Sequence, residues 1–264
     1  MADKEDRLFQ LVLFNGQTHF SRLIQYCQKR QLKHIAQTIN LRDGYIFSHA
    51  AILLKGSRMP SFKKFVSPDR FYLFESTAGG PSDIQAKSIF GVQVRDFEKV
   101  LQSLPATEKV AIVDFKILDN VEMDDVVLQQ LINSIDAFIL SSIGISYPIS
   151  ILKFLGAFFS KLRIDVGRTN LIHFPFPKTY FCSQLVSDFL KHLGMIPLST
   201  ESRSVLPMDF LGHDYDAIHR GGLPPICDVH TMKILSPSAI LENLLSNQNN
   251  APKESNKEQI ATNN

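Results

Sequence analysis

The stretch "YIFSHAAILLKG", residues 45–56, decides the fold because it predicts a buried strand that contains a single histidine. Its aromatic and aliphatic residues are typical of a strand, and few of its side chains are polar. Alternate side chains of a strand point to the same face of the sheet. His49 therefore shares a face with Phe47, Ala51 and Leu53, and we expect its side chain to face an apolar layer.

The next apolar stretch is "RFYLFES", residues 70–76, which predicts a second strand. The segment between the two strands, residues 55–69, is polar and contains two prolines, so a loop is expected there. Leu73 and Glu75 lie on one face of the second strand, and a hairpin-like pairing would bring Glu75 beside His49. A histidine on an apolar face is more often a satisfied core residue than a catalyst, so this pair alone leaves a structural role open.

The rest of the chain adds helices around a central sheet. Further strands are predicted at residues 90–94 and 109–118, and amphipathic helices at 17–32, 122–140 and 180–194. These elements predict an α+β protein.

The third predicted helix, "YFCSQLVSDFLKHLG", places Cys182 in its first turn. The unpaired amides and the positive end of the helix dipole favour the thiolate there and lower the pKa of the thiol. Cys182 is therefore the candidate nucleophile, with His49 as its base and acid and Glu75 as the group that orients the imidazole.

Other residues near the cysteine are weaker candidates. The backbone amides of Cys182 and Ser183 could donate to a developing oxyanion. Tyr180 could line the pocket or help the oxyanion, although packing in the core is the more common role of a buried aromatic residue. His173 is the best alternative base, because it precedes the cysteine helix closely.

The segments "SHAAILL", "FESTAGG", "YFCSQLV" and "SVLPMDFL" together resemble the circularly permuted branch of the NlpC/P60 papain-like superfamily. This branch includes the YiiX/YaeF proteins and poxvirus relatives, and it is distantly similar to lecithin:retinol acyltransferase. In it the catalytic histidine precedes the cysteine, and an acid follows the histidine on a neighbouring strand. His49, Glu75 and Cys182 match these three positions in that order.

The resemblance covers roughly residues 41–215 and implies a permuted papain-like fold, with an antiparallel sheet packed on the cysteine helix. It also implies a thiol hydrolase or acyltransferase that acts on an amide or ester bond, either a peptidase or amidase or a lipid-directed enzyme. Two segments differ from the usual pattern of the branch. The chain has "CSQL" where Cys-Ser-Glu-Leu is usual, and "GISYP" at residues 144–148 where Gly-x-x-Tyr-Asp is common.

Three regions are expected in the chain: a helical extension over residues 1–40, a catalytic domain over 41–243, and a disordered polar tail over 244–264. The formal net charge of +2 argues against nucleic acid as a partner. The chain has three cysteines, an odd number without the close spacing of a disulfide-linked domain. This pattern is typical of a protein in a reducing compartment. The mixed charges of "MADKEDRLFQ" are unlike a signal peptide, so a cytoplasmic location is expected, with delivery into another cell or association with a membrane as alternatives.

The most apolar part of the chain is residues 135–159. Its Gly and Pro residues interrupt it, so buried helices are the expected structure and an interfacial helix in peripheral contact with a membrane is the alternative. "CDVH" at residues 227–230 lacks the second pair of ligands that a structural zinc needs, so no metal or other cofactor is expected. A peptide, an amide-linked compound or a lipid ester is the expected substrate, and a non-catalytic peptide- or lipid-binding module on the same fold is the alternative function.

Overall fold

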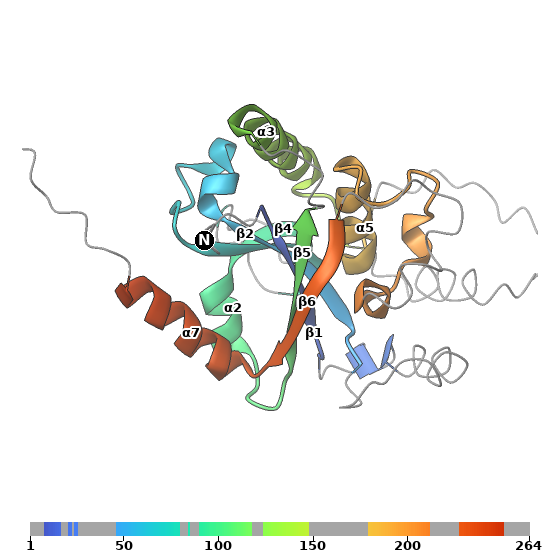
Figure 1. Ribbon diagram of the computed structural model, residues 1–264. Coiled ribbons are helices and arrows are strands. Elements are labelled where there is room, and N and C mark those ends of the chain that lie inside the picture. Colours follow the sequence, from blue (N-terminus) through green and yellow to red (C-terminus); the bar gives the residue numbers. More distant parts are fainter. Residues whose placement is uncertain are drawn as a thin grey trace, which may run out of the picture.

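The structure is a computed structural model that describes residues 8–16, 21–22, 24–25, 46–79, 84, 90–117, 124–147, 179–211 and 227–250. Within these ranges it is an α+β fold built on one six-stranded sheet (Figure 1). The strands are β1 (Gln10–Phe14), β2 (His49–Lys55), β3 (Phe71–Thr77), β4 (Gly91–Asp96), β5 (Val110–Ile117) and β6 (Cys227–Leu235). Their order across the sheet is β4-β3-β2-β1-β5-β6, and every neighbouring pair is antiparallel.

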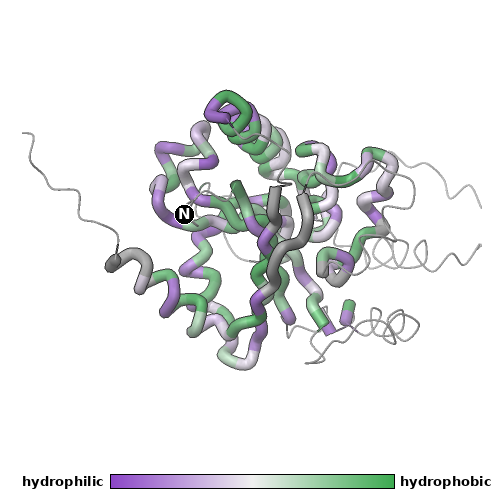
Figure 2. The backbone as a smooth tube through the Cα atoms, in the orientation of Figure 1, coloured by the Kyte–Doolittle hydropathy of each residue, from purple (hydrophilic) through white to green (hydrophobic). Residues whose placement is uncertain are grey.

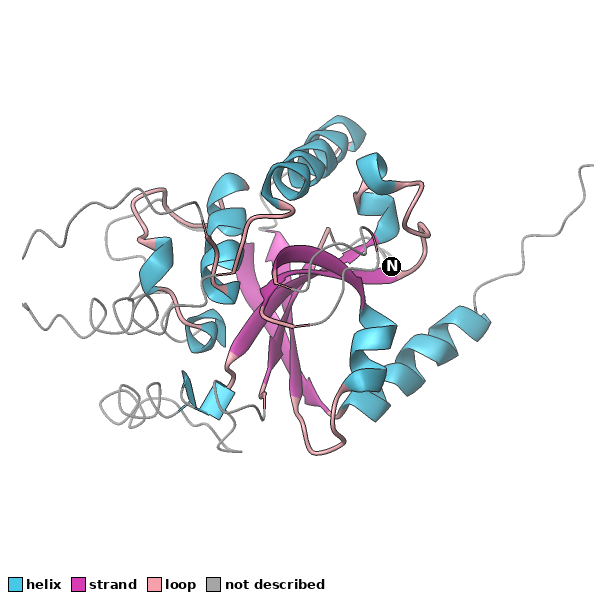
Figure 3. Cartoon of the chain, turned by 180° about the vertical axis from the view of Figure 1, so that it is seen from behind, coloured by secondary structure: helices cyan, strands magenta, loops and turns pink. Residues whose placement is uncertain are grey.

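The helices of the described residues lie around this sheet. The α-helices are α2 (Phe97–Ser103), α3 (Asp125–Ser142), α5 (Cys182–His192) and α7 (Pro237–Asn250). Short 3₁₀ helices are formed by Gly56–Arg58, Pro60–Phe62, Ser202–Ser204 and Pro207–Leu211. Figure 3 shows the α-helices around the sheet from behind. None of the helices in the described ranges is long and apolar enough to cross a membrane.

The alternation of side chains along the strands divides the interior into two cores. Ala50, Ile52 and Leu54 of β2 face the first core, which α3 and α5 cover with residues such as Phe138 and Phe189. The intervening residues of β2, Ala51 and Leu53, face a second core that α2 and α7 cover. Hydrophobic residues accordingly run along the strands, while α3 carries both hydrophobic and hydrophilic ones (Figure 2). The period-two pattern of the sequence thus decides which helices each side chain meets.

Four aromatic rings in contact hold the cysteine helix against the first core. The ring of Phe189 on α5 makes edge contacts with Phe138 on α3 at 5.6 Å and with Phe9 at 5.1 Å between ring centroids. Phe138 in turn meets Phe74 of β3 at 6.1 Å. Edge-to-face pairs of this kind add to the free energy gained by burial. They connect α5 to the strand that carries Glu75.

The predicted strands are confirmed, with small shifts at their ends, and the predicted helices 122–140 and 180–194 correspond to α3 and α5. Asp124 explains where α3 begins, because its carboxylate accepts a hydrogen bond of 2.7 Å from the amide of Val127. Most of the predicted helix 17–32 lies outside the described residues, and positions 21–22 and 24–25 are helical.

The sequence analysis placed residues 1–40 in a helical extension outside the catalytic domain. This prediction is wrong for residues 10–14. They form β1, which lies between β2 and β5 in the middle of the sheet. Leu11, Val12 and Leu13 are fully buried because a central strand is covered on both faces. Such a strand is a short apolar run without alternation, a pattern that does not distinguish strand from helix.

The prediction of a disordered tail over residues 244–264 is wrong for its first part, because α7 (Pro237–Asn250) continues to Asn250. Ile240 is buried in the second core, and Leu241 and Leu244 pack against it. These apolar contacts explain why the helix extends into the polar segment. Residues 251–264 lie outside the described part of the chain, as do 148–159 of the apolar segment.

Candidate active site

Antiparallel pairing of β2 with β3 brings His49 and Glu75 together. The register aligns Ile52 with Phe74 and Leu53 with Leu73, so His49 and Glu75 lie on the same face, near the start of β2. His49 Nε2 and Glu75 Oε2 are 2.6 Å apart. The side chain of Glu75 is only 3% exposed, against 23% for His49. The proximity predicted from the strand pattern is therefore confirmed.

A residue that the sequence analysis did not identify, Arg95 of β4, holds the other oxygen of Glu75. Arg95 Nη1 donates to Glu75 Oε1 at 3.0 Å. Leu73 is the register partner of Arg95, and Glu75 that of Gln93, so both charged side chains lie on one face of the β3–β4 pair. The predicted strand ended at residue 94. Even a longer predicted strand would not have placed Arg95 beside Glu75, because their shared face depends on the register of β3 with β4.

Cys182 is the first residue of α5, so the prediction that it lies in the first turn of this helix is confirmed. Three hydrogen bonds fix the position of the first turn of this helix. Ser76 Oγ of β3 donates to the carbonyl of Tyr180 at 2.6 Å, and the amide of Tyr180 donates to the carbonyl of Ser146 at 3.1 Å. Ser183 Oγ donates to the carbonyl of Val205 at 2.6 Å. These bonds connect the start of the cysteine helix to β3, to Ser146 and to Val205, which directly follows the 3₁₀ helix Ser202–Ser204.

Cys182 meets His49 at the start of β2, and the two groups shift each other's protonation. Burial alone would lower the pKa of His49, but the Cys182 thiolate and Glu75 outweigh burial and raise this pKa to about 10. Burial would also raise the pKa of the Cys182 thiol. The charge and hydrogen bond of His49, together with the amides of Ala50 and Ser183, instead lower it. Each group thus favours the charged form of the other, and the contact shifts the pair toward a thiolate and an imidazolium.

The tautomer and orientation of the imidazole follow from its two partners. Since Glu75 accepts from Nε2, the ring nitrogen that remains for the thiolate is Nδ1. Burial would raise the pKa of Glu75, but His49 and Arg95 stabilise its carboxylate and lower this pKa. Glu75 therefore stays ionised and keeps the imidazole fixed.

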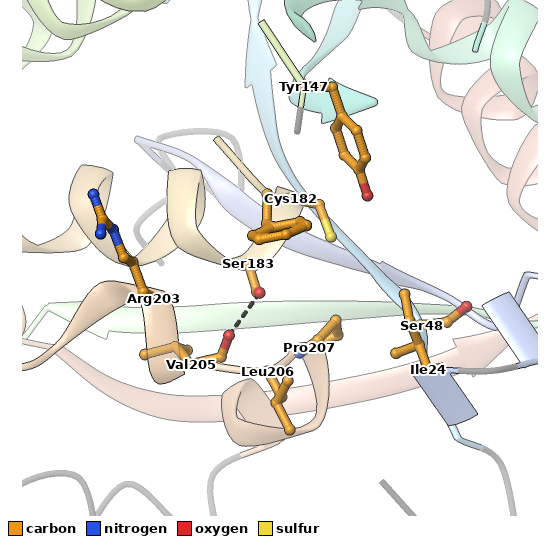
Figure 4. A pocket seen from close by; sticks show the side chains of 10 residues that line it. Ile24, Ser48, Tyr147, Cys182, Ser183, Arg203, Val205, Leu206 and Pro207 are labelled. Carbon is orange, nitrogen blue, oxygen red and sulfur yellow. Dashed lines mark hydrogen bonds between the residues drawn. The ribbon is translucent and has the colours of Figure 1, made fainter. Parts of the chain in front are cut away.

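Cys182 opens onto a pocket (Figure 4). Its wall is mostly apolar and includes one cationic side chain. The lining residues are Ile24, Ser48, Tyr147, Phe181, Cys182, Ser183, Arg203, Val205, Leu206 and Pro207.

Tyr147, rather than Tyr180, contributes a phenol to this pocket. In Figure 4 the hydroxyl of Tyr147 points toward the side of Cys182 that carries the sulfur. Burial and the nearby Cys182 thiolate raise the pKa of Tyr147, so the hydroxyl keeps its proton. Tyr180 packs in the first core instead, so the suggested place for it in the pocket wall is wrong.

The position of Tyr147 results from an extension of the sheet edge. The amide of Val92 donates to the carbonyl of Ile145 at 2.8 Å, and Gly144 donates to the carbonyl of Val92 at 3.0 Å. Gly91 makes room for this approach with φ of +121°, a conformation that side chains other than glycine rarely adopt. The "GISYP" segment was the only signal for Tyr147 in the sequence.

The described residues do not place the side chains of two further candidates relative to this site. His173 lies outside the described residues, and "CDVH" forms the start of β6. Within the described ranges, no group of three or more His, Cys, Asp or Glu side chains is arranged to hold a metal ion. No protein-family model matches the chain, and no curated protein matches it.

Proposed function

We propose that this protein is a cysteine hydrolase or acyltransferase with a circularly permuted papain-like fold, which cleaves an amide or ester bond through a thioester on Cys182. The observation that carries the proposal is the chain of contacts from Cys182 through His49 to Glu75. It joins a nucleophile, a proton carrier and an orienting acid, the three groups that nucleophilic acyl transfer requires.

The fold supports the same proposal. A cysteine begins a helix that packs on an antiparallel sheet, and the histidine and the acid come from two neighbouring strands of that sheet. The histidine precedes the cysteine in the chain, as in the permuted branch that the sequence resembles.

In the acylation step, the Cys182 thiolate attacks the carbonyl carbon and forms a carbon–sulfur bond, while the carbonyl π electrons move onto oxygen. The imidazolium of His49 gives its Nδ1 proton to the leaving amine or alcohol as the bond to the leaving group breaks. The product is a thioester on Cys182 and a neutral His49. Glu75 holds Nε2–H throughout and stabilises the imidazolium of the resting state.

The oxyanion of each tetrahedral intermediate needs donors close to the sulfur. The Cys182 amide at the start of α5 and the protonated hydroxyl of Tyr147 are suited to this role. The Ser183 amide already stabilises the thiolate, so it supports the nucleophile.

The thioester is then resolved by water or by another acyl acceptor. Neutral His49 takes a proton from the acceptor, whose oxygen or nitrogen attacks the thioester carbonyl. The intermediate collapses by expelling the thiolate, which restores the ion pair with the His49 imidazolium. A peptide, an amide-linked compound or a lipid ester fits this scheme.

The test is to trap the thioester. Wild-type protein mixed with p-nitrophenyl acetate should release a burst of p-nitrophenolate and carry an acetyl group on the peptide that contains Cys182. Cys182→Ala should show neither, whereas Cys27→Ala and Cys227→Ala should behave as the wild type does. Absence of the burst from the folded wild-type protein, or equal acetylation of the Cys182→Ala variant, would reject the proposal.

A further inference from the structure

Glu108 is a buried acidic residue that the proposed mechanism does not use. It lies two residues before β5 and is only 5% exposed. Its backbone amide donates to the carbonyl of Pro105 at 2.9 Å, whereas no described residue forms a hydrogen bond or an ion pair with its carboxylate. Removing a carboxylate from water without such a partner costs free energy. The contacts of the fold therefore do not account for an acidic side chain at this position.

The pairing of three strands places Glu108 at the His49 end of the sheet. Phe14 of β1 is the register partner of His49 on β2 and of Val110 on β5. The amide that follows Phe14 donates to the carbonyl of Lys109 at 2.9 Å, so this pairing continues past the start of β5. Glu108 precedes Val110 by two residues, and alternation therefore places its side chain on the face that carries Phe14 and His49.

The groups around the His49 imidazole come from both sides of β2. Glu75 belongs to β3, and Cys182 belongs to α5, which packs on β2 and β3. On the other side, β1 brings the uncharged ring of Phe14, whose centroid is 5.7 Å from that of the imidazole, and Glu108 comes from the β5 segment beyond it. Burial raises the pKa of Glu108, and the charge of His49 partly offsets this effect. No other described residue acts on this carboxylate.

Glu108 changes the balance of charge around His49. Without it, the positive charges of His49 and Arg95 equal the negative charges of Cys182 and Glu75 in the ion-paired state. Glu108 adds a carboxylate to which no described residue supplies a bound cation. Its attraction to the imidazolium is therefore not cancelled locally, and water screens charges in such a buried setting less than at the surface.

We propose that Glu108 is a second positioning residue of the candidate site, whose carboxylate stabilises the His49 imidazolium from the β1 side and keeps it protonated toward higher pH. This role rests on the proposed function and acts through His49. In the resting state the imidazolium holds the proton that the leaving group receives. During deacylation neutral His49 takes a proton from the acceptor, and the same carboxylate stabilises the imidazolium as it forms.

The test follows the titration of His49 by NMR in protein with isotope-labelled histidines, where the His49 signal is identified by its loss in His49→Gln. In the wild type the midpoint should lie above the ordinary value of 6.5. Glu108→Gln should lower this midpoint by about one pH unit, because it removes the charge and keeps the size of the side chain. Glu108→Asp should keep part of the effect. Glu242→Gln, which removes an exposed carboxylate on α7, should leave the midpoint unchanged.

Urea unfolding separates this role from a structural one. Since the carboxylate has no described partner, Glu108→Gln should be at least as stable as the wild type, whereas a residue needed for the fold would lose stability on this change. Glu108→Met supplies a second uncharged side chain of similar size, and its His49 midpoint should match that of Glu108→Gln. Repeating the NMR comparison in Cys182→Ala shows the effect of Glu108 on His49 without the thiolate.

The titration needs no turnover, so the failure of this inference and the failure of the proposed function are distinguishable. A raised His49 midpoint that is the same in the wild type and in both uncharged Glu108 variants would overturn this inference alone. A wild-type midpoint at or below the ordinary 6.5 would overturn the proposed function and this inference with it, because no ion pair would then hold the imidazolium.

Discussion

Arg95 Nη1 donates a hydrogen bond of 3.0 Å to Glu75 Oε1, the carboxylate oxygen that His49 leaves free. The guanidinium and the imidazole therefore hold Glu75 from both sides. Its carboxylate is almost fully buried, so it needs both partners to remain charged. Cys182, His49, Glu75 and Arg95 thus form a continuous series of contacts, and Arg95 is the member furthest along it from the sulfur.

Arg95→Met should weaken catalysis without removing any atom that touches substrate. Loss of the guanidinium raises the pKa of Glu75 and loosens its hold on the imidazole, so we expect kcat to fall about tenfold, with KM little changed. The acidic limb of the pH profile of kcat should also move to higher pH. Steady-state kinetics between pH 4 and 9 measures both effects, and Arg95→Lys should restore part of kcat. An unchanged pH profile would show that Arg95 is structural only.

Glu75→Gln should reveal how the carboxylate contributes to stability. The folded-state pKa of Glu75 lies below its ordinary value of 4.5, so its contribution is fully present above that pH and is lost as the pH falls through the folded-state pKa. Near pH 7 the variant should be less stable by roughly 1–3 kcal/mol. The difference should shrink as the pH is lowered below 4.5. Urea unfolding at several pH values measures it, and a constant difference would contradict the assignment.

Tyr147→Phe should separate the oxyanion role of this residue from its packing role. The change removes only the hydroxyl, so the ring contact with Phe181 at 5.9 Å remains possible. We expect kcat to fall by about 100-fold, as for loss of one oxyanion donor, with KM nearly unchanged. Tyr180→Phe is the matched control, because its ring lies in the core and outside the pocket wall. Equal losses of kcat in the two variants would argue against the role of Tyr147.

Gly91→Ala should disturb the segment that carries Tyr147. A Cβ at this position would lie 2.4 Å from the carbonyl oxygen of Ile145, and the φ of +121° strains any residue other than glycine. We expect a loss of roughly 1–3 kcal/mol in the free energy of unfolding and a lower kcat. Gly79→Ala is a suitable control, since nothing lies within 4 Å of its added Cβ. A stable Gly91→Ala variant with full activity would show that this contact is not needed.

The sequence predicted the parts of the site that follow from side-chain periodicity or from the position of a residue in its own helix. Alternation along β2 and β3 predicted that Glu75 meets His49, and the first-turn position of Cys182 was visible from the apolar stripe of its helix. Both inferences needed only neighbouring or directly paired elements.

The features that were missed depend on long-range contacts. β1 is a short apolar run that became a strand because two distant strands pair with it. Arg95 becomes part of the site through the register of β3 with β4. Tyr147 reaches the pocket because Gly144 and Ile145 bond to Val92 of the edge strand, a contact that no local pattern in the sequence encodes.

The central claim, a Cys182 thiolate held by the His49 imidazolium, is tested most directly by the pH dependence of alkylation. Cys27 and Cys227 are replaced by serine, so that iodoacetamide reports on Cys182 alone. The account predicts an alkylation midpoint below the ordinary thiol value of 9.0. In His49→Gln the midpoint should rise to 9.0 or above, because burial then dominates, while His192→Gln at the far end of α5 should leave it unchanged. A midpoint of 9.0 or higher in the protein with His49 intact, or the same midpoint with and without His49, would contradict the account.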